Sequence, residues 1–76
     1  MTIADTPGDR ALQMARDFTA LGLRDLIAGH ERTLDTLDAL DATHGDAGMA
    51  ARAEARVYYT AEIEVATQAL AIRGMR

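Results

Sequence analysis

The longest stretch of the sequence without Gly or Pro runs from residue 49 to residue 73. This stretch is rich in Ala, Glu, Arg and Gln, which are good or fair helix formers, and its apolar positions recur three and four residues apart. We therefore expect a helix over residues 49–73 that ends at Gly74. Such a helix is about 37 Å long, so the rest of the fold has to supply a long covering surface.

A second one-sided helical pattern covers residues 23–43. Its apolar arc holds Leu23, Leu26, Ile27, His30, Leu34, Leu37 and Leu40. Residues 44–48 contain two Gly and one Asp, a composition typical of a turn. Two long helices joined by a turn this short predict an antiparallel helical hairpin.

A shorter helix is expected before the hairpin. Thr6, Pro7 and Asp9 form a helix start, with Thr as N-cap and Pro in the first helical position. The helix is predicted over residues 7–21, and Gly22 is expected to break or kink the chain because an internal Gly costs about 1 kcal/mol relative to Ala. Residues 1–5 have no periodic pattern and are expected to be disordered or extended.

The chain is short enough to form one all-α domain with a thin core. Its 76 residues are 49% hydrophobic, but sixteen of these hydrophobic residues are Ala, and there is no Cys to form a disulfide. A domain of this size rarely gains more than about 3–5 kcal/mol from a single core. We therefore expect oligomerisation, as a homodimer or a larger helical bundle, to complete the fold.

Composition excludes several functional classes. The net charge of −4 disfavours binding to DNA. No apolar run reaches the roughly 18–20 residues that cross a bilayer, and the N-terminus lacks the pattern of a signal peptide, so a cytoplasmic protein is expected. With neither Cys nor Ser and no phosphate-binding loop, the chain is not expected to be an enzyme or to hold a cofactor.

Metal binding is not expected either. Asp35, Asp38 and Asp41 recur every three residues and His44 follows them, which gathers possible ligands near the turn. A solvated acidic helix face explains this spacing, and the Glu-x-x-His pattern of di-iron bundles is missing.

Two polar residues lie inside the apolar arcs of the hairpin. If the chain turns near residue 46, His30 faces Glu62, and a charge-assisted hydrogen bond would offset their burial. We interpret them as a buried polar pair that fixes helix register. Two alternatives remain: an acid–base site with a nearby tyrosine, and a register in which the two side chains never meet.

Four residues early in the third helix form a candidate ligand site. Arg52 and Arg56 lie one turn apart near the positive end of the helix dipole, and Tyr58 and Tyr59 follow. Guanidinium groups and aromatic rings together can bind a phosphate or a nucleotide base. The alternative is structural, with the two arginines forming salt bridges to acids of the second helix.

The leading functional hypothesis is a non-enzymatic interaction module of adaptor, accessory or inhibitor type. It would self-associate and bind another protein through a helical face. The alternative is an oligomeric binder of a small anionic ligand, such as a nucleotide, that uses Arg52, Arg56, Tyr58 and Tyr59 at a subunit boundary. A metal-dependent helical enzyme would require His30 and Glu62 to converge with further carboxylates.

Overall fold

The computed structural model of the protein describes residues 7–74, and this part of the chain is helical with no strand. The helices are α1 (Pro7–Asp17), α2 (Ala20–His44) and α3 (Met49–Gly74). The all-helical prediction is therefore confirmed. The expected N-cap at Thr6 and the prediction for residues 1–5 lie outside the described residues.

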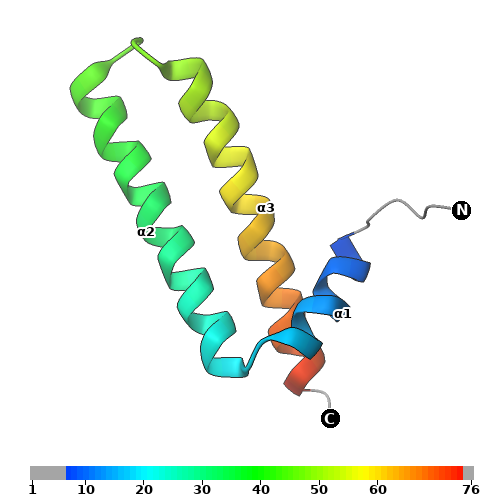
Figure 1. Ribbon diagram of the computed structural model, residues 1–76. Helices are drawn as coiled ribbons and strands as arrows, with labels where there is room; N and C mark the ends of the chain where they lie inside the picture. The colour runs from blue at the N-terminus through cyan, green and yellow to red at the C-terminus, as the bar shows by residue number, and fades with distance from the viewer. Residues whose placement is uncertain (1–6, 75–76) are drawn as a thin grey trace, which may run out of the picture.

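Helix α3 is the central element of the fold. Helices α2 and α3 lie side by side and run in opposite directions, with the turn at one end (Figure 1). Helix α1 packs against α3 near the other end, where α2 begins and α3 finishes. The three helices therefore meet at one end of the molecule, and α2 and α3 continue from there to the turn without α1.

The helical backbone is interrupted between α1 and α2, at Phe18 and Thr19. Thr19 has an extended backbone (φ −75°, ψ 163°), and its Oγ1 accepts a hydrogen bond of 2.9 Å from the amide of Gly22. Thr19 is thus the N-cap of α2, a position for which Thr is well suited. The predicted break or kink at Gly22 is wrong, and the first helix ends at Asp17 instead of residue 21. Gly22 lies in the first turn of α2, where an added Cβ would lie 3.3 Å from Oγ1 of Thr19 and crowd the cap.

The turn between α2 and α3 depends on two glycines. Gly45 and Gly48 have φ values of +56° and +74°, in the region that glycine adopts without a steric penalty. The amide of Gly45 donates to the carbonyl of Asp41, and the amide of Met49 donates to that of Asp46. These bonds satisfy backbone groups that the two helix ends would otherwise leave unpaired.

The core lies where the three helices meet. Its buried residues are Ala15, Leu23, Ala66 and Ala69, and the partly buried residues packed on it are Met14, Leu26, Ile27, Leu70 and Ile72. Leu23 is the largest side chain that is fully buried in the described part of the chain. Because the other fully enclosed positions are alanines, the helices approach closely but remove little apolar surface from water.

Candidate functional site

Arg52, the first residue of the predicted ligand site, is buried against the turn. Its Nε donates to Asp41 at 2.5 Å, its Nη1 to the carbonyl of Ala47 at 2.5 Å, and its Nη2 to the carbonyl of Gly45 at 2.5 Å. All three nitrogens of the guanidinium therefore have acceptors from the protein itself. Arg52 binds the end of α2 and the turn to the first turns of α3.

Arg56 lies one turn after Arg52 and binds the same side of α2. Its Nη2 donates to Asp38 at 2.9 Å and also to Asp41. Asp41 thus accepts from both arginines, and the hydrogen bond from Arg52, followed by that from Arg56, holds the pKa of the Asp41 carboxyl below its ordinary value. The hydrogen bonds from Arg56 to Asp38 and Asp41 in turn raise the pKa of Arg56.

The two tyrosines of the predicted ligand site belong to an aromatic cluster. The ring of Tyr58 meets that of Tyr59 edge-on, with centroids 5.0 Å apart, and Tyr58 is 57% exposed. The ring of Tyr59 is half-buried and lies 5.2 Å from the imidazole of His30. The cluster therefore connects α3 to α2 and leaves one tyrosine ring open to solvent.

These contacts change the interpretation of the four predicted ligand residues. An anion approaching Arg52 would have to displace Asp41 or the turn carbonyls, and one approaching Arg56 would meet the carboxylates of Asp38 and Asp41 that are already bound at its Nη2. The structure thus has the salt bridges to acids of α2 that formed the structural alternative. The ring of Tyr59 contacts the rings of Tyr58 and His30.

Glu62 is buried, but its partner is Arg10 instead of His30. The Arg10 guanidinium donates to the Glu62 carboxylate at 2.6 Å. No hydrogen bond or ion pair joins His30 to Glu62 in the residues that the structure describes, so the expected polar pair is corrected to Arg10–Glu62. The physical reason is that α1 lies on the face of α3 that carries Glu62, whereas His30 packs on the neighbouring face through Tyr59.

The described residues, 7–74, hold neither a metal-binding cluster nor a membrane-spanning helix. Within residues 7–74, no three His, Cys, Asp or Glu side chains are grouped so that they could hold a metal ion. In the same part of the chain, no helix has both the length and the apolar character needed to cross a membrane.

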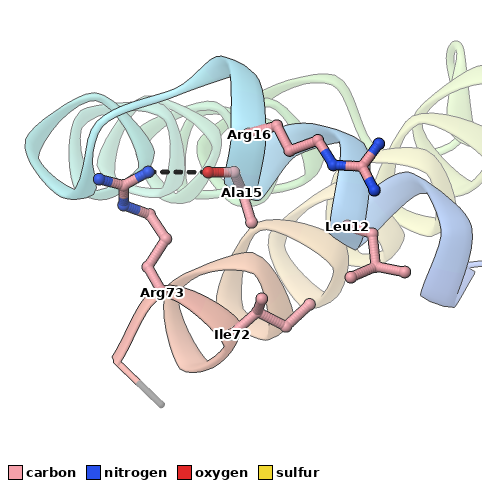
Figure 2. Close-up of a pocket in the computed structure, with 5 residues that line it drawn as sticks. All are labelled: Leu12, Ala15, Arg16, Ile72 and Arg73. Atoms are coloured by element: carbon pink, nitrogen blue, oxygen red, sulfur yellow. Dashed lines mark hydrogen bonds between the residues drawn. The ribbon is translucent and has the colours of Figure 1, made fainter. Parts of the chain in front are cut away.

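A shallow groove of about 320 Å³ lies between α1 and α3 (Figure 2). We call it the α1–α3 groove, and its lining residues are Leu12, Ala15, Arg16, Ile72 and Arg73. The apolar side chains of Leu12 and Ile72 lie across it from each other, and the Arg16 side chain extends along its α1 side. The groove therefore combines an apolar floor with a cationic rim.

Arg73 closes the end of α1 beside this groove. Its Nη1 donates to the carbonyl of Ala15 at 2.7 Å and to that of Phe18 at 2.9 Å. These carbonyls belong to the C-terminal end of α1, where a cation is favourable. Sequence reasoning missed the groove because no spacing in the sequence shows that α1 packs on the last turn of α3.

Comparison of the chain with protein-family models, with curated proteins and with solved structures finds no match. A proposal for the function of this chain therefore depends on the contacts and exposed surfaces of the molecule.

Proposed function

We propose that this chain is a non-enzymatic interaction module: a helical hairpin with a docked N-terminal helix that self-associates and binds another protein through a helical face. The observation that supports this proposal is that, within residues 7–74, more large apolar side chains are exposed than are buried. The large apolar side chains that are buried are Leu23, Leu37 and Val65. Those that are 40–72% exposed are Leu12, Phe18, Leu21, Met49, Val57 and Tyr58.

This imbalance favours association on energetic grounds. Full burial of one Leu, Val or aromatic side chain contributes about 1.5–3 kcal/mol, whereas a single domain of this size rarely gains more than about 3–5 kcal/mol in total. Covering even two of the exposed side chains therefore adds an amount comparable to the stability of the isolated fold. A second copy or another protein can supply that cover.

The half of α3 nearer the turn is the helical face best placed for a protein partner. Helix α1 has 11 residues and α3 has 26, so α1, which is about 16 Å long and crosses α3 at an angle, covers less than half of a helix that is about 39 Å long (Figure 1). Beyond α1, Val57 and Tyr58 are more than half exposed. Tyr58 is also held by its edge contact with Tyr59, and rigid tyrosines are frequent among the residues that contribute most to interfaces.

The polar groups support an interaction role over a chemical one. The charged side chains that are buried, Arg52 and Glu62, are both engaged in contacts that join elements of the fold. Arg56, the other arginine expected to bind a ligand, is paired with two carboxylates. These groups stabilise the arrangement of the helices and present no free reactive pair.

Light scattering coupled to size exclusion, over a hundredfold range of protein concentration, tests the proposal. We expect a mass of at least twice 8.2 kDa at the upper concentrations. A mass of 8.2 kDa at every concentration would exclude self-association. Labelling the protein at Thr36, an exposed position on α2 rather than on α3, then allows partner binding to be compared between wild type and Tyr58→Glu.

A further inference from the structure

We propose that the α1–α3 groove receives Leu21 and Asp25 from a second copy of this chain. The inference rests on the self-association proposed above, and it names the surface and the residues that make the contact.

The groove is suited to an apolar side chain that has a carboxylate beside it. Leu12, Ala15 and Ile72 form its apolar part, and no acidic residue lines it. Arg16 at its edge is exposed and makes no hydrogen bond or ion pair with any residue that the structure describes. Arg73 is fixed in place by its two bonds to the end of α1. The unpaired guanidinium of Arg16 can therefore donate hydrogen bonds to a carboxylate from outside the molecule.

The start of α2 carries a matching pair of side chains. Leu21 is 66% exposed, and Asp25 follows one turn later and is also exposed. Both lie two positions from the buried Leu23, which places them on the side of α2 opposite the core. At a spacing of four residues, Leu21 and Asp25 are neighbours on the helix surface. Asp25, like Arg16, has no ion-pair partner among the described residues.

The two surfaces complement each other in polarity and in charge. Leu21 of one copy would fill the apolar part of the groove in the other, and Asp25 would pair with Arg16. Because the chain carries a net charge of −4, a groove with a purely cationic rim is a local exception that favours an acidic occupant. The start of α2 and the end of α3 lie at the same end of the molecule, so copies related by a two-fold axis would make the contact twice (Figure 1).

Charge reversal tests the pairing of Arg16 with Asp25. The self-association constant is measured by sedimentation equilibrium for wild type, Arg16→Asp, Asp25→Arg and the double variant. We expect each single variant to associate about tenfold more weakly, because like charges then face each other, and the double variant to return close to the wild-type constant. A double variant as weak as the single ones would overturn the pairing.

Leu21→Gln tests the apolar part of the contact and is also expected to weaken association about tenfold or more. Val57→Gln is measured beside Leu21→Gln to probe the turn half of α3. The matched controls are Ala42→Gln, an exposed apolar residue near the turn end of α2, and Arg32→Asp, an exposed arginine further along α2. Both should leave the constant unchanged, and circular dichroism checks that every variant keeps its helical content.

The outcomes separate this inference from the proposed function. A wild-type protein that self-associates while the variants at positions 16, 21 and 25 associate as strongly would overturn the groove contact and leave the interaction module standing. A wild-type protein that stays monomeric would contradict both the groove contact and the self-association proposed for the module. Loss of association in Val57→Gln alone would move the interface to the turn half of α3 and overturn the groove contact.

Discussion

Arg10 in α1 and Glu62 in α3 form an ion pair of 2.6 Å between residues 52 positions apart in the sequence. The Glu62 side chain is 12% exposed and that of Arg10 is 41% exposed, so the pair lies at the edge of the α1–α3 contact. This ion pair fixes α1 against the middle of α3 and explains how a carboxylate is tolerated on an otherwise apolar stripe.

Removal of Arg10 should destabilise the fold by leaving the Glu62 carboxylate buried without its cation. We expect Arg10→Ala to lower the free energy of unfolding by about 1–3 kcal/mol. Adding Glu62→Leu should recover most of that loss, because no buried charge then remains. Urea unfolding at a single protein concentration measures both effects, with Arg24→Ala as an exposed control. A double variant less stable than Arg10→Ala would contradict the explanation.

Arg52 should matter more for stability than any exposed arginine of the chain. Arg52→Ala removes three hydrogen bonds that join α3 to Asp41 and to the turn carbonyls, and we expect a loss of about 1–3 kcal/mol. Arg32→Ala, on the exposed side of α2, should change the free energy of unfolding by less than about 0.5 kcal/mol. Thermal melts followed by circular dichroism compare the two, and equal effects would argue against the buried arginine as the anchor of the turn.

Stability should depend on pH through Asp41. Its pKa in the folded protein is held below the ordinary value of 3.8, first by the hydrogen bond from Arg52 and then by that from Arg56. A lowered carboxyl pKa stabilises the fold above the unfolded value, and this contribution disappears as the pH falls through the lowered folded value. Asp41→Asn should therefore be less stable near neutral pH and show a shallower loss of stability in acid. Urea midpoints from neutral pH down to about pH 2 measure this, and parallel curves for both proteins would contradict it.

Replacing Gly29 and Gly48 with alanine should change the stability of the fold in opposite directions. At Gly29, within α2, an added Cβ would meet only the end of the Arg32 side chain at 3.8 Å, so Gly29→Ala should stabilise the fold by about 0.5–1 kcal/mol. At Gly48, φ is +74° and a Cβ would lie 3.2 Å from Nη1 of Arg52, so Gly48→Ala should cost about 1–2 kcal/mol. Urea midpoints test both. A destabilising Gly29→Ala would indicate that another helix packs on that side of α2.

The sequence predicts the helical class and the long elements because their signals are local. The third helix is predicted over residues 49–73 and is observed over Met49–Gly74. A long stretch without Gly or Pro shows directly where a helix can continue. The boundary between α1 and α2 could not be read in this way. Gly22 and Thr19 are both helix-boundary signals three residues apart, and only the cap geometry shows that Thr19 begins the helix and Gly22 lies within it.

Helical spacing in the sequence does not predict which side chains of the candidate site meet. Periodicity identified His30 and Glu62 as polar residues within apolar stripes, but it treated each helix as having a single apolar face. Helix α3 has two neighbours, so Glu62 faces α1 while the stripe that includes Tyr59 faces α2. The partner of Glu62 and the residues of the α1–α3 groove depend on contacts between distant segments, which helical spacing does not encode.

The bonds from Arg73 to the end of α1 have a consequence for the order of folding. They join residues 58 and 55 positions apart, whereas the bonds from Arg52 to the turn carbonyls span only 5 and 7 positions. Because closing a long loop costs more entropy than closing a short one, the bonds of Arg52 to the turn can form before those of Arg73 to α1. The C-terminal end of α1 therefore receives its cap only after the turn has formed, and until then Ala11 and Ala15, which are buried in the finished fold, stay exposed to water.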